Sequence, residues 1–270
     1  MKLIRSRNNP FFKELVKLSG TARQRNKTNQ TLLDGAHLLA AGLDAGQPPL
    51  HILLNDAAVR DDEIVALLNR AGDVPITQLD DNLFAELSEL KTPTGVLALI
   101  KIPQVTLTVA TARFALLLED IQDPGNLGSM LRSAAAAGCD AVFLSPGCAD
   151  VWSPKVLRAA MGGHFALHIY PQQDLLSIAK LFVGTLLATK LTADRSLYVC
   201  DLRGNVAFLI GNEGAGLSAD LLKFATQTIA IPMPGKVESL NAAAAAAVCL
   251  FEAVRQRENK FDYRLVGKCG

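Results

Sequence analysis

The sequence predicts an α/β protein in which a small α/β domain precedes a larger domain, built on a parallel sheet with flanking helices. Strand-like and helical segments alternate twice along the chain, and residues 103–112, which show few periodic features, separate the two series. The second series opens with a fully apolar run at residues 115–118, which is typical of a strand buried in a parallel sheet. A chain of 270 residues is long enough for one large or two small domains.

The composition excludes several classes of protein. Half of the residues are apolar and a fifth are charged, which is ordinary for a globular protein and excludes a disordered one. No run approaches the roughly 18 apolar residues of a membrane span, and the N-terminus lacks the apolar core of a signal peptide. We therefore expect a soluble, cytoplasmic protein without membrane contact.

The first series of elements occupies residues 30–102. Acidic residues open the helix expected at residues 61–70, where they favour its macrodipole. We expect this series to form the small domain, and residues 103–112 to link it to the second. The other expected elements are strands at residues 31–34, 51–54, 76–79 and 95–101 and helices at residues 36–43 and 82–90.

The second series occupies residues 113–270. Its last helix contains the alanine run 242–247, which is strongly helix-forming and lets a neighbouring backbone approach closely. The expected strands are residues 115–118, 141–144, 165–170, 185–189, 206–210 and 228–231, and the expected helices are residues 129–137, 154–161, 218–225 and 239–257.

Residues 1–29 are predicted to form a basic arm. The first 30 residues hold eight Lys and Arg side chains and a single acid, Glu14, although the whole chain has a net charge of only +1. A basic arm on a faintly acidic body suits contact with a phosphate backbone. A solvated helix with a loose tail explains the same charges equally well.

The cysteines and histidines do not favour a metal site. The five cysteines are far apart and form no Cys-x-x-Cys pair, which indicates reduced, packed thiols. His164 and His168 have the spacing of helical metal ligands, but residues 165–170 are more typical of a strand. We therefore predict that the protein binds no metal.

Three strands of the second series end in loops rich in Gly, Pro and Asn, at residues 119–128, 210–218 and 231–241. Any one of these loops is a common turn. All three also contain polar residues that are not needed to form a turn. Ligands of open parallel sheets bind at the carboxyl ends of the strands. The three loops together therefore predict one binding site.

The second loop also matches the dinucleotide-binding fingerprint. Gly214-x-Gly216-x-x-Ala219 follows an expected strand and precedes an expected helix, and Glu238 lies about 20 residues further on. The fingerprint belongs near the start of a six-stranded unit, and too little chain follows Gly216. A nicotinamide-dependent oxidoreductase is therefore the second interpretation. A non-catalytic RNA-binding module, in which the loops are only turns, is the third.

In combination, the loops resemble the three signature motifs of the SpoU (TrmH) family of RNA ribose 2′-O-methyltransferases, in the SPOUT superfamily. The resemblance covers residues 117–256 and is most specific at residues 231–241, with Arg255 and Gln256 at the end of the next helix. Glu119 stands where the family more often has aspartate, and it keeps the charge.

Other segments extend the resemblance. Residues 150–158 and 161–163 resemble the stretch that the family carries between its first two motifs. Residues 30–101, with residues 34–38 and 92–96, resemble its smaller substrate-binding domain, where Asp34 replaces a usual glutamate.

The resemblance implies a C-terminal trefoil knot, a homodimer, and S-adenosylmethionine as the cofactor, held in the knot. It implies that Gly211, Ile231 and Leu240 grip the cofactor largely through their backbone, and that Thr189 and Met233 line the pocket. Apolar walls with a few backbone donors and acceptors suit an adenosine ring.

The resemblance also implies five catalytic residues, Asn126, Arg132, Glu213, Ser239 and Asn241. We expect Arg132 to clamp the target phosphate and stabilise the developing alkoxide, because a guanidinium does not normally lose its proton; a general-base role is the alternative. Asn126 would hold its loop and Arg132, and Glu213 would orient donors or complement the sulfonium charge. Ser239 and Asn241 are expected at a helix N-terminus, which offers free N–H groups; purely structural roles as an N-cap and a first-turn residue are the less favoured alternative.

The resemblance indicates that the substrate is RNA. Family members with an appended small domain act mostly on ribosomal RNA, so ribosomal RNA is favoured over transfer RNA by analogy.

Overall fold

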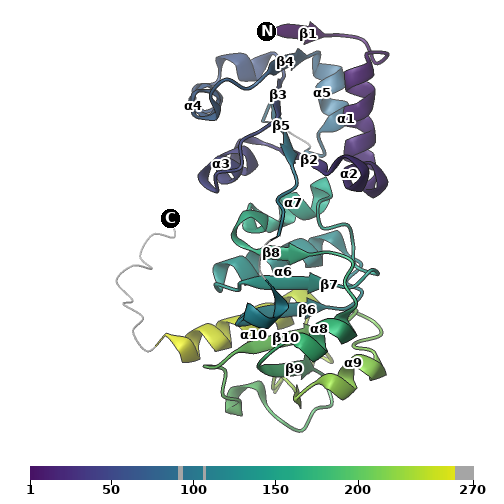
Figure 1. The fold of residues 1–270 in the computed structure, drawn as a ribbon, viewed down its shortest axis with the longest axis vertical. Coiled ribbons are helices and arrows are strands. Elements are labelled where there is room, and N and C mark those ends of the chain that lie inside the picture. Colours follow the sequence, from purple (N-terminus) through teal and green to yellow (C-terminus); the bar gives the residue numbers. More distant parts are fainter. Residues whose placement is uncertain (91–93, 106–107, 259–270) are drawn as a thin grey trace.

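The computed structural model describes residues 1–90, 94–105 and 108–258, which form two α/β domains stacked along the long axis of the molecule (Figure 1). Residues 92–93 of the family resemblance and Cys269 lie outside the described residues. No helix in these ranges is long and apolar enough to cross a membrane.

A five-stranded mixed sheet forms the first domain. Its strand order is β1-β4-β3-β5-β2, in which β5 runs antiparallel to both of its neighbours and the other pairs are parallel. The strands are β1 (Lys2–Ile4), β2 (Gln30–Asp34), β3 (His51–Leu54), β4 (Ile76–Leu79) and β5 (Val96–Lys101).

Helices cover both faces of this sheet. α1 and α5 bury Phe12, Leu15 and Phe84 against one face, whereas α3 and α4 bury Leu39 and Ile64 against the other. The helices are α1 (Pro10–Gly20), α2 (Ala22–Thr28), α3 (Ala36–Asp44), α4 (Asp62–Ala71) and α5 (Asp81–Leu87), with a 3-10 turn η1 (Ala57–Arg60).

Residues 1–28 are part of this domain, which differs from the separate basic arm expected from their charge. β1 pairs in parallel with β4, and the apolar face of α1 is buried against the sheet. The side chain of Asn9 accepts hydrogen bonds from the N–H groups of Phe11 and Phe12, and Pro10 occupies the first turn. Apolar spacing and this cap, rather than the charge, determine the structure of the segment.

A six-stranded sheet forms the second domain. Its order is β11-β9-β10-β6-β7-β8, and every neighbouring pair is parallel, as the fully apolar strands predict. The strands are β6 (Phe114–Leu118), β7 (Ala141–Leu144), β8 (His168–Tyr170), β9 (Thr185–Thr189), β10 (Val206–Ile210) and β11 (Gln227–Ile229).

Helices α6, α7 and α10 pack on one face of this sheet, and α8 and α9 pack on the other. α6 and α7 approach closely at Gly128, where an added Cβ would lie 2.4 Å from Cβ of Ala159. The helices are α6 (Pro124–Ala136), α7 (Pro154–Ala160), α8 (Leu175–Leu181), α9 (Ala219–Phe224) and α10 (Ala242–Arg257), with 3-10 turns η2 (Val109–Thr111), η3 (Gly163–Ala166) and η4 (Leu197–Val199).

Several elements differ from the sequence prediction. α6 begins at Pro124 rather than at residue 129, because Asp123 caps it by accepting the N–H of Asn126. α10 begins at Ala242 rather than at residue 239, because Asn241 is its N-cap. The strand expected at residues 165–170 is divided into η3 and β8, and α8 is an additional helix.

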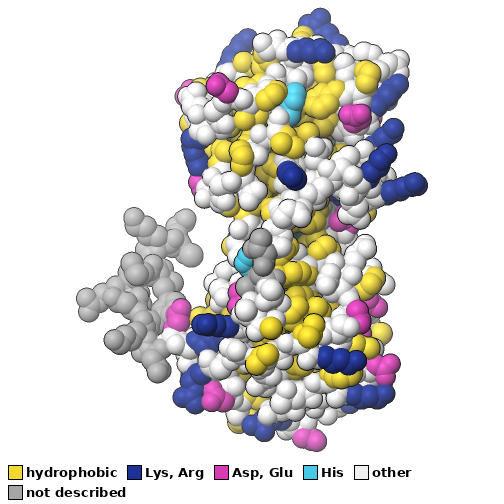
Figure 2. All heavy atoms as spheres, in the orientation of Figure 1, with side chains coloured by type: hydrophobic (Ala, Val, Ile, Leu, Met, Phe, Trp, Pro, Cys, Tyr) yellow, Lys and Arg dark blue, Asp and Glu magenta, His cyan; other side chains and the backbone are white. Residues whose placement is uncertain are grey.

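The two domains share an apolar core. One cluster of buried side chains contains Leu33 and Leu39 of the first domain together with Val151 and Trp152 of the second. In Figure 2, Lys and Arg side chains lie along the outer edges of the first domain, at the top of the view, and hydrophobic side chains run across the junction below it. Contact between the domains is therefore apolar in large part.

Candidate active site

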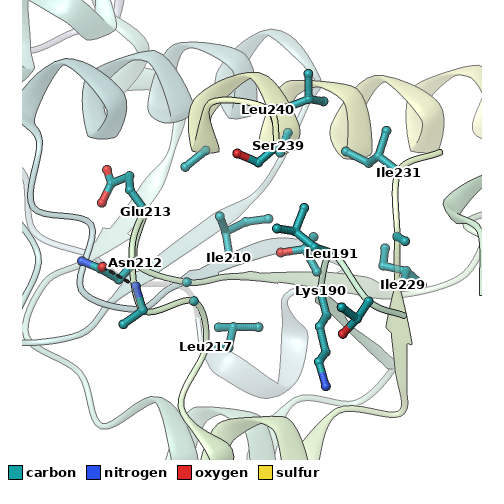
Figure 3. A pocket seen from close by; sticks show the side chains of 18 of the residues that line it. Lys190, Leu191, Ile210, Asn212, Glu213, Leu217, Ile229, Ile231, Ser239 and Leu240 are labelled. Carbon is teal, nitrogen blue, oxygen red and sulfur yellow. Dashed lines mark hydrogen bonds between the residues drawn. The ribbon is translucent and has the colours of Figure 1, made fainter. Parts of the chain in front are cut away.

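The loops that follow β9, β10 and β11, together with the start of α10, surround a cavity of about 570 Å³ (Figure 3). These loops leave the carboxyl ends of parallel strands, where open sheets bind their ligands. A volume of several hundred cubic ångströms is typical of a small-molecule site. The last two of the three sequence loops therefore meet at one cavity, as their composition predicts.

Every residue for which the resemblance implies cofactor contact lines this cavity, namely Thr189, Gly211, Ile231, Met233 and Leu240.

Additional apolar residues complete the cavity wall. Leu240 lies on the α10 side of the cavity in Figure 3, and Leu217 lies on the opposite side. Ile210, Ile229 and Leu191 line it as well, although sequence reasoning did not select them. Ile210 lies in a loop range already identified and Ile229 precedes the third loop, whereas Leu191 lies in the short loop after β9, which has no distinctive composition.

Gly211 lets two backbone segments come into contact beside the cavity. A Cβ at this position would lie 2.2 Å from the carbonyl carbon of Gly216 and 2.4 Å from the backbone nitrogen of Leu217. Any side chain here would push the loop after β10 away from the strand end. Glycine is therefore required by close approach, and its φ is not the reason.

Three catalytic candidates from the three sequence loops are joined by hydrogen bonds. Nδ2 of Asn126 donates to Oε1 of Glu213 at 2.9 Å, and Nδ2 of Asn241 donates to Oδ1 of Asn126 at 2.9 Å. Oδ1 of Asn241 also accepts from the N–H groups of Ala243 and Ala244, which caps α10. The network connects the first helix turns of α6 and α10 to the tip of the loop after β10.

The catalytic candidates differ in how they meet the cavity. Glu213, Ser239 and Asn241 line it, whereas Asn126 contacts two of the lining residues from outside. Ser239 lies before α10 and is not its N-cap, and Asn241 is the cap rather than a first-turn residue. Asn126 lies in the first turn of α6 rather than in a loop.

Arg132 does not line the cavity. It lies further along α6 with an exposed side chain, and its guanidinium has no hydrogen-bond or ion-pair partner within residues 1–90, 94–105 and 108–258. Its Cα packs next to Gly163, where an added Cβ would be 3.3 Å away. The fold therefore presents Arg132 to solvent, on the helix that begins at Asn126.

Two polar residues hold the loop after β10 in shape, although sequence reasoning did not select them as site residues. Asn212 accepts from the N–H groups of Gly214 and Ala215 at 2.9 and 3.0 Å, and its Nδ2 donates to the carbonyl oxygen of Asp120 at 2.8 Å. Oε2 of Glu119 accepts from the N–H of Ser218 at 2.7 Å. The first and second loops are therefore tied at both ends of the segment that carries Glu213.

The histidine pair considered as metal ligands has other structural roles. His164 lies in η3 and His168 in β8, so they do not share a helix face. Nε2 of His164 lies 2.7 Å from the carbonyl oxygen of Val151, and burial lowers the pKa of this histidine to about 4. Among the described residues, no cluster of three or more His, Cys, Asp or Glu side chains could hold a metal ion.

The fingerprint Gly214-x-Gly216 does not open a dinucleotide-binding unit. It follows β10, and β11 is the only strand after it in the part of the chain that the structure describes. The loop instead closes on itself through the N–H of Gly216, which donates to the carbonyl oxygen of Asn212 at 2.9 Å.

Comparison with family models gives two matches. Residues 113–251 match the model of the SpoU rRNA Methylase family, and residues 9–98 match that of the MRM3-like substrate binding domain. The second match begins within the predicted basic arm, in agreement with the packing of α1 against the first sheet.

Two curated bacterial relatives match along nearly their whole length. The chain is 36% identical to an uncharacterized tRNA/rRNA methyltransferase of Synechocystis sp., over 94% of each protein. It is 34% identical to the 23S rRNA (guanosine(2553)-2′-O)-methyltransferase RlmP of Bacillus subtilis, over 93% of this chain and 98% of that protein.

Solved structures agree in both domains. An RNA 2′-O ribose methyltransferase superposes with a TM-score of 0.81 at 32% identity, covering 94% of this chain and 99% of that one. The SpoU methyltransferase AviRb from Streptomyces viridochromogenes, solved in complex with AdoMet, gives a TM-score of 0.81 at 28% identity, covering 93% and 100%.

Proposed function

Because the chain belongs to the SpoU rRNA methylase family, we propose that it transfers a methyl group from S-adenosylmethionine to a ribose 2′-hydroxyl of ribosomal RNA. The observation that carries this proposal is the network of Asn126, Glu213 and Asn241 at the edge of a cavity lined by every implied cofactor residue. A turn-forming role alone would not require three separate loops to share one chain of side-chain hydrogen bonds.

The cavity fits S-adenosylmethionine. Its walls are largely apolar, and Gly211, Gly216 and Leu217, whose backbones approach each other closely, line it; apolar walls with a few backbone donors and acceptors suit an adenosine moiety. The carboxylate of Glu213 lies on its lining, where it complements a positively charged ligand. The cofactor, when bound, supplies a methyl group on a sulfonium leaving group.

The side chains of this protein would align the ribose hydroxyl and assist loss of its proton. Glu213 accepts one hydrogen bond from Asn126, so its carboxylate can accept further hydrogen bonds from a bound ligand. Asn126 and Asn241 hold that carboxylate in one orientation. Ser239, exposed on the lining, offers a hydroxyl to the reacting group.

Arg132 would clamp the phosphate next to the target ribose. Its guanidinium is exposed and has no partner in the described ranges, so no internal ion pair must break before a phosphate binds. A planar fork suits bidentate recognition of phosphate, and a fixed positive charge stabilises the developing alkoxide.

The first domain would bind the RNA. Lys13 and Lys17 of α1 and Arg23 and Lys27 of α2 are exposed. Exposed cations on two adjacent helices favour contact with a phosphate backbone, which releases counterions. This proposal replaces the predicted basic arm with a folded basic surface made of four of its cations.

The active unit would be a homodimer located in the cytoplasm, with the knot that the resemblance implies. In support of the dimer, Phe251 on α10 is 48% exposed and Leu240 next to the cavity is 38% exposed, and apolar side chains of this size favour a covered surface. Light scattering of the purified protein tests the dimer, and a monomeric mass at working concentration with full activity contradicts it.

The direct test has two parts. S-adenosylmethionine should bind by calorimetry and nicotinamide nucleotides should not; the reverse result would revive the oxidoreductase interpretation. Ribose methylation should then be mapped across all stable RNAs of cells with and without the gene. Loss of a methyl group from ribosomal RNA in cells without the gene supports the proposal, and loss from transfer RNA means that transfer RNA is the substrate. Tight RNA binding with no lost methyl group favours a non-catalytic RNA-binding module.

A further inference from the structure

An ion pair between a buried arginine and a partly exposed aspartate joins the two domains; the Asp150 side chain is 21% exposed. Arg25, on α2, is 4% exposed; its Nε donates to Oδ2 of Asp150 at 2.7 Å, and its Nη2 lies 2.5 Å from the same oxygen. Its Nη1 donates to the carbonyl oxygens of Leu18 and Ser19, at 2.6 and 2.8 Å. Although Arg25 belongs to the basic N-terminal segment, burial keeps it away from an RNA phosphate. Its charge serves the contact between domains.

A second buried contact lies beside this ion pair. Thr31, on β2, is 0% exposed, and its Oγ1 donates to the carbonyl oxygen of Trp152 at 2.8 Å. The N–H of Trp152 in turn donates to Oδ1 of Asp150 at 3.1 Å. The first domain thus holds residues 150–152 at two points, the side chain of Asp150 and the backbone of Trp152. Buried polar groups that lose their partners are strongly disfavoured, so the arrangement resists opening.

The segment held in this way leads into α7, which packs against α6, the helix that carries Asn126 and Arg132. Ser153 caps α7, whose Ala159 meets α6 at Gly128 with no room for a side chain between them. Gly163, just after α7, packs next to Cα of Arg132 on α6. Rigid, close-packed contacts therefore continue from the first domain to the helix of the active site.

We propose that Arg25 and Thr31 are positioning residues for methyl transfer. Through Asp150 and the backbone of Trp152, they hold the first domain in one orientation relative to the cofactor cavity. The distance between the RNA-binding surface and the cavity is then constant, and this distance selects which ribose receives the methyl group. The inference rests on the proposed function in one respect, that the first domain binds the RNA.

The physical reason is alignment. A loose junction would let bound RNA adopt many orientations, in most of which the hydroxyl and the methyl group are not in line. Misplacement by about 1 Å can cost on the order of 100-fold in rate. Cofactor affinity would not change, because neither residue lines the cavity.

The test uses a double variant, Thr31→Val with Asp150→Asn. The first change removes the hydroxyl and keeps the branched shape, and the second removes the charge and keeps the side-chain size. The matched control is Thr77→Val with Asp140→Asn. Thr77 is 5% exposed and its Oγ1 bonds to His51 within the first domain. Asp140 accepts the N–H groups of Arg113 and Phe114 within the second.

Three quantities are measured on the full-length chain: the Kd for S-adenosylmethionine, the rate and position of methylation on ribosomal RNA, and the radius of gyration by small-angle scattering. We expect the double variant to lose about tenfold in kcat/KM, to methylate riboses near the original one, and to have a larger radius of gyration. Its cofactor Kd should stay within about twofold of the control. If its folded fraction is low, Thr31→Val alone is measured in the same way.

The proposal is overturned if the variant methylates the same ribose at the rate of the control. If the wild-type protein neither binds nor methylates ribosomal RNA, the proposed function has failed, and scattering alone decides the role of the junction. Equal radii for the variant and the control then overturn it, and a larger radius for the variant supports it.

Discussion

Asn126 and Glu213 are 87 positions apart in the sequence, and their side chains share a hydrogen bond of 2.9 Å at the edge of the cavity. Asn126 does not line the cavity itself; it reaches the site only through Glu213 and Asn241. We therefore expect that loss of this hydrogen bond lowers the rate of the chemical step and leaves the affinity for the cofactor almost unchanged.

Asn126→Ala should lower methyl transfer about 100-fold, because Glu213 and Asn241 lose the side chain that orients both of them. Cofactor affinity should change by less than about threefold. Calorimetry and single-turnover methylation measure the two effects. Asn205→Ala is the control, since Nδ2 of Asn205 also donates one hydrogen bond, to the carbonyl oxygen of Val183, at the opposite end of β10. Equal losses of affinity and rate would mean that Asn126 shapes the cavity instead.

Arg132→Ala should abolish methyl transfer and leave the unfolding midpoint and the cofactor affinity unchanged, because the exposed side chain has no partner to lose in the described ranges. Arg132→Lys distinguishes the two roles. A phosphate clamp predicts partial activity without a steep rise at high pH. A general base predicts activity that climbs as the amine loses its proton. Full activity in Arg132→Ala would remove this residue from the site.

Gly211→Ala should weaken S-adenosylmethionine binding by more than about tenfold, because the new methyl group would overlap the backbone at Gly216 and force the loop away. Gly204→Ala, just before the same strand, is the matched control, since no atom lies within 4 Å of the position its Cβ would take. Calorimetry measures both variants. Normal affinity in Gly211→Ala would show that the loop can move without loss of the site.

Replacing Lys13, Lys17, Arg23 and Lys27 by Gln should reduce the slope of log K against log salt for RNA binding by up to about 3.6, at roughly 0.7–0.9 for each phosphate that the protein no longer neutralises. These changes test the basic surface without deleting residues 1–29, a truncation that would remove β1 and expose the core beneath α1. Lys180→Gln on α8 is a control outside this surface. An unchanged slope means that the RNA lies elsewhere.

The stability of the protein should fall as the pH drops from about 6.5 toward 4. Burial lowers the pKa of His164 to about 4, below the value of about 6.5 expected in the unfolded chain. The unfolded state then binds the proton more tightly, so His164 contributes its full stability above pH 6.5 and loses up to about 3 kcal/mol by pH 4. Denaturant unfolding across this range measures the effect. His164→Gln should flatten the slope, whereas the exposed His37→Gln should not.

Local sequence patterns predicted the strands and most of the helices, because apolar periodicity and caps act over a few residues. The parallel sheet followed from the apolar runs of β6 and β10. Asp123 followed by Pro124 is also a typical helix start. It was missed from the sequence because the Gly, Pro and Asn residues around it were assigned to a loop. The network joining Asn126 to Asn241 could not be predicted from spacing alone, since only the packing of α10 beside α6 brings their first turns together.

The N-terminal segment shows the opposite error. Charge predicted an arm, yet a segment can be both basic and folded, because Lys13 and Lys17 point outward while Phe12 and Leu15 point inward on one helix. Arg25 is a further case. From sequence it is one cation among eight, and only tertiary structure assigns it to Asp150. No local pattern distinguishes a cation that binds a partner domain from one that faces solvent.

The order of strands in the second sheet has a consequence for how the enzyme is made. β6 is synthesised first but lies between β10 and β7, and α10, which supplies Asn241, is the last described helix. The pairing of β6 with β10 must therefore wait for residues 206–210, and the hydrogen bond from Asn241 to Asn126 must wait for the start of α10. Non-local parallel pairing of this kind is slow, and it leaves apolar strands uncovered for a time. A half-made chain would thus be both inactive and prone to aggregate, and cofactor binding would serve as an assay of completed folding.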